Sequence, residues 1–203
     1  MHDPFYNKSE ENYFTIGHLP HLSQEQKVYA VTFRLCDSLP KHVTETYRKE
    51  STRLYGDGAG CQEERDRFMH TKMMAYMDQG YGACWLRNPA VRQVVEKALE
   101  YVNDKMALVH AYVIMPNHVH VVLETNEGME IQRVMHSLKS YTALQINRLL
   151  HRTGSLWQRE CYDRIIRNTD HYVNAINYII ENPRYCKEGE YSLKVFGEQG
   201  SSR

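Results

Sequence analysis

The sequence of 203 residues has no net charge, few cysteines and no long hydrophobic run. Its 25 Lys and Arg residues equal its 25 Asp and Glu residues, so the strong basicity common among nucleic-acid-binding domains is absent. The five cysteines are odd in number and form no CxxC pair. This pattern fits reduced thiols in a cytosol better than a disulfide framework or a cysteine-based zinc site.

No segment approaches the ~18 consecutive apolar residues of a membrane-spanning helix, and the first residues lack the features of a signal peptide. We therefore expect a cytoplasmic protein with no membrane partner. A chain of this length holds one domain with a hydrophobic core. We place this domain at residues 27–185, between an N-terminal arm, 1–26, and a C-terminal tail, 186–203.

Hydrophobic periodicity predicts strands and helices over most of this domain. Runs of β-branched and aromatic residues predict strands at 28–35, 106–115, 118–124 and 156–167. Apolar residues at helical spacing predict helices within 41–77, interrupted at 56–60, and at 89–102, 130–150 and 170–182. The order of these elements indicates an α+β fold, a ferredoxin-like antiparallel sheet with helices packed on one face.

Two histidines follow the expected Pro116-Asn117 turn, in the segment MPNHVHVV. His118 and His120 are two residues apart, so their side chains leave the same face of a strand and can meet one ion. Two neutral imidazoles with an oxygen ligand suit Mg²⁺ or Mn²⁺, and the spacing also serves Zn²⁺. Hydrogen-bonded histidines on a half-buried strand would give the same tripeptide.

The last predicted helix, DHYVNAINYIIEN, carries a tyrosine that its packing does not require. Residues placed at about 100° intervals put Val173, Ile176 and Ile180 on the predicted core-facing stripe. Tyr178 falls roughly opposite, with Asn182 as its i+4 neighbour, and the amide oxygen of Asn182 suits a hard cation. A surface tyrosine beside a helix-ending Asn-Pro pair would look the same.

Phosphodiester cleavage needs charge neutralisation at the phosphate and a nucleophile with an in-line approach. A metal held by His118 and His120 could polarise and orient the phosphate. A tyrosine hydroxyl, with a pKa of about 10, attacks poorly unless a nearby cation or base favours its anion. Tyr141 is the rival nucleophile, but its place on an apolar helical stripe favours a core role.

Basic residues concentrate in the segment 133–167, where seven Lys and Arg residues accompany only Glu160 and Asp163. This segment could neutralise phosphates, and its aromatic residues could stack on unpaired bases. A solvated basic face with buried aromatic residues would have the same composition. The residues that we expect to bind DNA are Arg133, Lys139, Arg148, Arg152, Trp157, Arg159, Arg164 and Arg167.

Four ordered segments resemble the REP-associated tyrosine transposases, a branch of the single-tyrosine, HUH-type, IS200-like transposases. They are MPNHVH at 115–120, LWQR at 156–159, IIRN at 165–168 and YIIENP at 178–183. HLPH at 18–21 and YGACWL at 81–86 also resemble this branch, so the similarity covers most of residues 17–185. Each motif is modest alone, whereas the ordered set is specific.

The resemblance implies metal-dependent nicking of single-stranded DNA near a hairpin, through a transient 5′-phosphotyrosine link. His118 and His120 match the HUH pair of metal ligands, Tyr178 matches the nucleophile, and Asn182 matches the third ligand of a divalent metal, Mg²⁺ or Mn²⁺. The implied partner is single-stranded or hairpin DNA, which would associate the protein with a bacterial nucleoid. A homodimer stays open, because relatives are known in which the last helix completes a partner's active site.

Three functions remain open at this point. The first is an enzyme, a single-stranded DNA endonuclease and strand transferase that acts as a transposase. The second is a domesticated hairpin-DNA-binding protein without productive transposition. The third is a metal-dependent nucleic-acid hydrolase that uses water, for which Tyr178→Phe would leave cutting intact.

Overall fold

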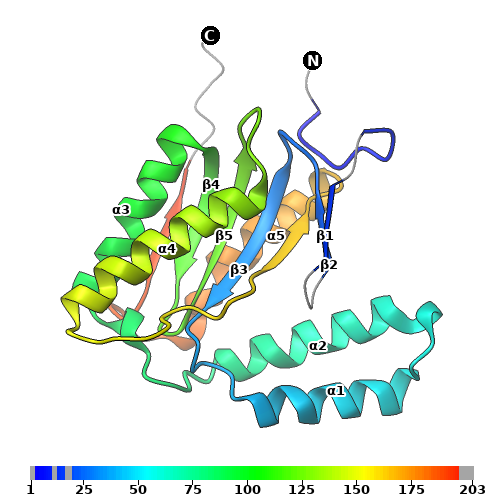
Figure 1. The fold of residues 1–203 in the computed structure, drawn as a ribbon, viewed down its shortest axis with the longest axis horizontal. Helices are drawn as coiled ribbons and strands as arrows, with labels where there is room; N and C mark the ends of the chain where they lie inside the picture. The colour runs from blue at the N-terminus through cyan, green and yellow to red at the C-terminus, as the bar shows by residue number, and fades with distance from the viewer. Residues whose placement is uncertain (1–2, 11–12, 17–19, 197–203) are drawn as a thin grey trace.

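The computed structural model describes residues 3–10, 13–16 and 20–196 and contains a five-stranded antiparallel sheet (Figure 1). The strand order is β6-β3-β5-β4-β7. The strands are β3 (Val28–Arg34), β4 (Ala107–Ile114), β5 (His118–Thr125), β6 (Tyr162–Ile165) and β7 (Ser192–Val195). A separate hairpin of β1 (Tyr13–Ile16) and β2 (Pro20–Ser23) precedes them. The predicted α+β class is confirmed.

Two helices, α3 (Pro89–Lys105) and α4 (Ile131–Leu149), cover one face of the sheet (Figure 1). Alternate residues of β3 and β5 point into this layer, as the period of two of a strand requires. Each fully buried aliphatic or aromatic side chain contributes about 1.5–3 kcal/mol to folding. The residues of β3 and β5 in this core are Tyr29, Val31, Phe33, Val119, Val121 and Leu123.

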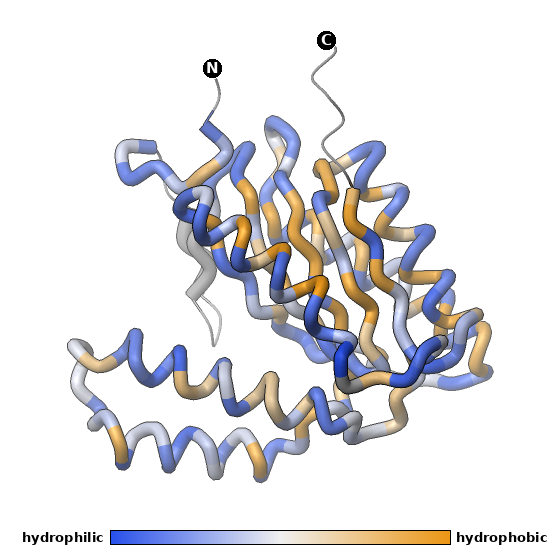
Figure 2. Tube along the Cα trace, turned by 180° about the vertical axis from the view of Figure 1, so that it is seen from behind, coloured by the Kyte–Doolittle hydropathy of each residue, from blue (hydrophilic) through white to orange (hydrophobic). Residues whose placement is uncertain are grey.

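The helix α5 (Thr169–Glu181) covers the opposite face of the sheet, as the view from behind shows (Figure 2). The prediction of helices on one face is therefore wrong for α5. The physical reason lies in β5, the middle strand, which is buried on both faces and so needs cover on both. Val122 of β5 packs in a second cluster, in which Ile179 of α5 is buried.

The helices α1 (Lys41–Tyr55) and α2 (Gln62–Met77) form a pair that extends beside the sheet (Figure 1). The predicted interruption at 56–60 is confirmed: Gly56, at φ 78°, ends α1, and the short helix η1 (Ala59–Cys61) leads into α2. The ring of His70 on α2 lies 4.4 Å from that of Tyr162 on β6, centroid to centroid. This contact brings the helical pair against one edge of the sheet.

The outer parts of the fold differ from the prediction in length. The predicted strand 156–167 is too long, because only Tyr162–Ile165 pairs as a strand. Trp157, in the preceding segment, forms an isolated bridge with Leu35, the residue that follows β3. The segment expected as a C-terminal tail contains β7, which pairs with β4. Two short helices complete the fold, η2 (Trp85–Arg87) and η3 (Asn182–Tyr185).

His18 and Leu19, which contribute to one of the family-like segments, lie outside the described residues. Across 3–10, 13–16 and 20–196, none of the helices combines the length and the apolar character needed to cross a membrane.

Candidate active site

The two histidines of β5 lie side by side on the face of the sheet that α5 covers. His118 and His120 are both buried, and their ring centroids are 4.7 Å apart. Burial lowers the pKa of His118 to about 3. Burial, followed by the charges of His118 and His70, lowers the pKa of His120 well below its usual value. Both rings are therefore neutral at pH 7, which is the form that binds metals.

Each imidazole has a hydrogen-bond partner at Nδ1. The side chain of Asn117 lies 2.7 Å from Nδ1 of His118, and Thr32 Oγ1 lies 2.7 Å from Nδ1 of His120. The Asn117 Nδ2 group donates to the carbonyls of Met77 and Tyr81, so its Oδ1 must face His118 as an acceptor. The neutral His118 ring then donates from Nδ1 and keeps a lone pair on Nε2, which can bind an ion.

Replacing Asn117 should weaken metal binding, because the His118 ring would lose the partner that fixes its tautomer and orientation. We expect Asn117→Ala to lower the affinity for Mn²⁺ by about 10–100-fold, as for other partners of metal-binding histidines. Isothermal titration calorimetry measures this change. Asn103→Ala is the matched control, since it removes a comparable hydrogen bond to the Val109 amide away from the histidines. Equal Mn²⁺ affinities in both variants would contradict the expectation.

Tyr178 contacts the histidine pair from α5. Its ring lies edge-on to His120 with centroids 5.1 Å apart and an interplanar angle of 85°, and the residue is 41% exposed. Burial of the hydroxyl, followed by the charge of Asp78, raises the pKa of Tyr178 to about 12, while a hydrogen bond with Asn182 and the charge of Arg184 lower it. The hydroxyl is therefore protonated at pH 7, and the residue remains reachable from solvent.

The orientation of α5 differs from the predicted one. Val173 and Ile180, expected to face the core, are each 46% exposed. The helix instead packs through Ile176 as predicted, together with Tyr172, Ala175 and Ile179, and the Tyr172 hydroxyl lies 3.0 Å from Nδ1 of His110 on β4. The prediction was wrong because apolar residues occupy more than one side of this helix, and only the sheet selects among them.

Four buried polar atoms near the pair have no hydrogen-bond partner within the described part of the chain. They are Nε2 of His118, Nε2 of His120, Oδ1 of Asn182 and Oδ1 of Asp78. Asn182 is only 8% exposed, and its side chain forms a hydrogen bond with the Tyr178 hydroxyl. An unsatisfied buried polar atom costs about 1–3 kcal/mol. Imidazole nitrogens and amide or carboxylate oxygens are all donors to divalent cations, so these residues fit such an ion.

The charge state of His70 should make the fold sensitive to acid. Burial, followed by the charge of Arg164, lowers the pKa of His70 from 6.5 to about 4. The unfolded chain therefore binds a proton here at a higher pH than the folded chain does. Stability is fully present above pH 6.5 and falls as the pH decreases toward 4, by on the order of 3 kcal/mol from this group.

Thermal denaturation between pH 7 and pH 4 tests this expectation. His70→Gln should reduce the loss of Tm on acidification, while His136→Gln, at an exposed position of α4, should leave it as in the wild type. An unchanged pH dependence in His70→Gln would show that this ring does not contribute.

The structure distributes the predicted DNA-binding residues over both sides of the sheet. Arg133 and Arg148 are exposed on α4, across the sheet from the histidine pair. Arg164 is exposed on β6 opposite Ala30, so it points to the histidine face. Arg159 and Arg167 are exposed in the segments before and after β6.

Two more of the predicted DNA-binding residues form hydrogen bonds with other residues of the chain. The ammonium of Lys139 donates to the Arg159 carbonyl at 2.7 Å. The guanidinium of Arg152 donates to Asn147 at 2.5 Å and to the Ser155 carbonyl at 3.1 Å. These contacts restrict both side chains but leave their charges near the surface.

The burial of Trp157 and of Tyr141 differs from what their predicted roles require. Trp157 is 6% exposed, its indole N–H donates to Thr142 at 2.9 Å, and its ring packs against Phe33. A buried ring has no face for a base, so the stacking role of Trp157 is contradicted. Tyr141, for which a core role was favoured, is exposed on α4, across the sheet from the histidine pair.

Several residues at the site were not singled out from the sequence as functional: Thr32, Arg34, Asp78, Asn117 and Arg184. Thr32 and Arg34 are the register partners of His120 and His118, and only the pairing of β3 with β5 reveals this. Asp78 follows α2 and Arg184 lies in η3, so no local sequence pattern connects them with the histidines. Asn117 directly precedes the pair, and its polar side chain at a turn was the one available signal.

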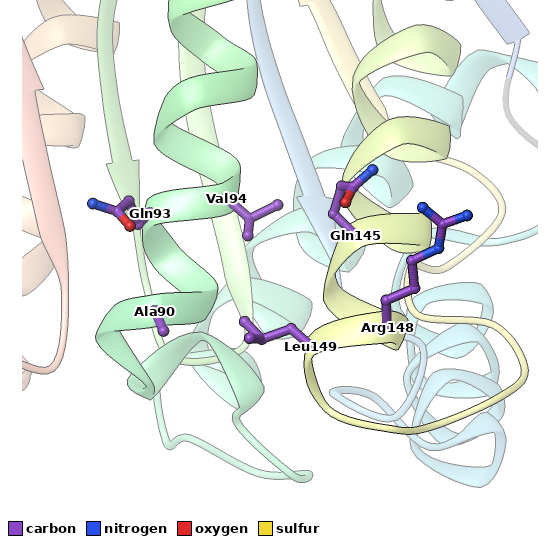
Figure 3. Close-up of a pocket in the computed structure, with 6 residues that line it drawn as sticks. All are labelled: Ala90, Gln93, Val94, Gln145, Arg148 and Leu149. Carbon is purple, nitrogen blue, oxygen red and sulfur yellow. The ribbon is translucent and has the colours of Figure 1, made fainter.

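An open groove of about 460 Å³ lies elsewhere, between α3 and α4 (Figure 3). Val94 from α3 and Leu149 from α4 line it, and Arg148 lies at its side. The groove belongs to the helical layer on the other face of the sheet, so it is separate from the candidate active site.

The two histidines are paired on a central strand, and a tyrosine from a helix lies against them. The family model "Transposase IS200 like" matches residues 81–182, which include both histidines, Tyr178 and Asn182. The chain belongs to this family of IS200-like transposases, and the family-level expectation from the sequence is confirmed.

Comparison with solved structures gives a weaker likeness. One similar structure is described as a REP-associated tyrosine transposase bound to a REP hairpin. It is 15% identical to this chain, with a TM-score of 0.48, and the likeness covers 83% of this chain and 73% of that one. A search of curated protein sequences found no match.

Proposed function

We propose that this chain is a metal-dependent endonuclease and strand transferase for single-stranded DNA, a transposase that nicks near hairpins through a 5′-phosphotyrosine link. The observation that supports this best is the contact of Tyr178 with His120, with ring centroids 5.1 Å apart within one chain. Membership of the transposase family supplies the class of reaction. Residues 27–185, the proposed catalytic domain, contain the whole set of candidate groups.

His118, His120 and Asn182 would hold the divalent ion, Mg²⁺ or Mn²⁺, through Nε2, Nε2 and Oδ1. Their unpartnered buried atoms support this assignment. When bound, such an ion neutralises charge on the phosphate and favours the anion of a nearby phenol. The second effect matters here because the pKa of Tyr178 is raised to about 12.

The residues of the chain then exchange one phosphate ester for another. The Tyr178 oxygen forms a bond to phosphorus, and the bond from phosphorus to the 3′ oxygen of the preceding nucleotide breaks. The phenol loses its proton, and the departing 3′ oxygen gains one. Attack by the 3′-hydroxyl of a DNA end on this phosphotyrosine reverses the exchange, so strands can be rejoined without another energy source.

We propose that exposed basic residues on the histidine face guide the DNA strand to Tyr178. Arg164 and the half-buried Arg34 lie on this face of the sheet. Arg133 and Arg148 lie across the sheet, so they would contact only a strand that wraps around the domain. Such phosphate contacts would supply locally what the neutral net charge of the chain does not.

A denaturing gel tests the proposal with a labelled hairpin oligonucleotide and Mn²⁺. The wild-type chain should give a DNA-protein adduct that survives denaturation and disappears when the metal is chelated. Binding without any adduct or cleavage would favour the domesticated hairpin-binding protein. Cleavage without an adduct would favour the hydrolase that uses water.

A further inference from the structure

Asp78, which ends α2, brings a carboxylate to the histidine pair. Its Oδ1 lies 3.8 Å from Nε2 of His118. Both atoms are buried and without a hydrogen-bond partner in the described part of the chain. The residue is the C-cap of α2 and lies outside the segment 81–182 that the family model matches.

The protein holds Asp78 in this position from both sides. The Asp78 amide donates to the carbonyl of Met74 at 2.9 Å, as the cap of α2. The next contact comes from Asn117, which donates to the carbonyls of Met77 and Tyr81. The same Asn117 side chain orients the His118 ring. One asparagine thus fixes the carboxylate-bearing turn and the imidazole relative to each other.

A simple ion pair or hydrogen bond does not explain the arrangement. A separation of 3.8 Å is too long for a hydrogen bond. The Nδ1 proton of His118 goes to Asn117, so Nε2 presents a lone pair toward Asp78. A lone pair and a carboxylate oxygen repel each other unless a positive charge lies between them.

We propose that Asp78 is an anionic ligand of the same divalent ion that His118 and His120 hold, an inference that rests on the proposed function. Two atoms 3.8 Å apart can both bind one ion through bonds of about 2.1 Å. Among the described residues, no three His, Cys, Asp or Glu side chains are already grouped as a metal site, so binding as proposed would require the Asp78 carboxylate to move closer to the histidine pair. The Asp78 side chain as a whole is 24% exposed, although its Oδ1 is buried.

The donor set then consists of two imidazoles, one carboxylate and the amide of Asn182. One negative charge among nitrogen and oxygen donors favours Mn²⁺ over Mg²⁺, since nitrogen ligands suit transition metals better. Binding of the ion would also change the effect of the Asp78 carboxylate on the pKa of Tyr178. Without a cation its charge raises the pKa of the phenol, whereas an ion bound between them reverses the sign of the local field.

Calorimetric titration of the full chain with Mn²⁺ tests the assignment. Asp78→Asn, which keeps the size of the side chain, should weaken Mn²⁺ binding by about tenfold or more. Its Tm without metal should not fall, because the change removes a buried charge. His120→Ala should weaken Mn²⁺ binding by at least about 100-fold. Asp104→Asn, at an exposed ion pair at the end of α3, should leave the affinity unchanged.

A second variant distinguishes direct binding of the ion by Asp78 from an effect of its charge at a distance. Asp78→Cys should shift the preference of the site from Mn²⁺ toward Zn²⁺, because a thiolate suits zinc, and Asp104→Cys should cause no shift. The assignment of Asp78 would be overturned, with the metal site itself retained, if His120→Ala lost affinity but Asp78→Asn bound Mn²⁺ within twofold of the wild type. An unchanged metal preference in Asp78→Cys would overturn it in the same way. Unchanged binding in His120→Ala would instead overturn the proposed metal site itself.

Discussion

The variant Tyr178→Phe should form no covalent adduct with DNA. The change removes only the oxygen that attacks phosphorus, and the ring keeps its contact with His120. Loss of a nucleophile removes the covalent route altogether, so we expect a decrease of at least about 1000-fold in adduct yield. The denaturing gel with labelled hairpin oligonucleotide and Mn²⁺ measures this.

Tyr141→Phe is the matched control for this experiment. Tyr141 is exposed on α4, on the far side of the sheet, so its hydroxyl should not matter. The DNA affinity of Tyr178→Phe, measured without denaturation, should stay close to that of the wild type. An adduct that persists in Tyr178→Phe and vanishes in Tyr141→Phe would transfer the nucleophilic role to the other tyrosine.

Removing one imidazole should have an effect of comparable size. In His118→Ala or His120→Ala the ion loses a ligand from a buried site, and we expect a loss of Mn²⁺ affinity of at least about 100-fold. Adduct formation should fall with it, and excess Mn²⁺ should restore part of the yield. Each variant also removes a neutral buried ring, so circular dichroism must show that the sheet is retained.

The exposed His136→Ala on α4 serves as the control for the loss of a histidine. It should bind Mn²⁺ and form the adduct like the wild type. If His120→Ala formed adduct at the wild-type rate with Mn²⁺ at limiting concentration, the pair would not be the metal site.

The local parts of this site could be predicted from the sequence. The two histidines share a face because side chains alternate along any strand, wherever that strand lies in the sheet. Tyr178 and Asn182 are close because they are four residues apart on a helix. These relations need no knowledge of the rest of the fold, and the contact of Tyr178 with His120 follows the predicted association of the two elements.

The non-local parts could not be predicted. The face of α5 that packs on the sheet depends on which apolar side chains meet Val122 and its neighbours, so Val173 and Ile180 were placed wrongly. Trp157 looked like a base-stacking residue because its neighbours in sequence are basic, yet its neighbours in space are Phe33 and Thr142.

Asp78 shows the same limitation most clearly. It is 40 residues from His118 in sequence, and nothing in the intervening pattern links the end of α2 with β5. Contacts across such a distance depend on the tertiary arrangement of the helical pair. Only the structure places the Asp78 carboxylate beside the histidines, whereas the histidines, Tyr178 and Asn182 were predicted from the sequence.

Diffraction from a crystal soaked in Mn²⁺, recorded at the manganese absorption edge, would show directly whether the histidine pair holds a metal ion next to Tyr178. We expect one strong anomalous peak within bonding distance of Nε2 of His118 and Nε2 of His120, on the side of the pair where Tyr178 lies. A fully soaked crystal with no peak between these nitrogens, or with manganese bound only elsewhere on the chain, would contradict this expectation.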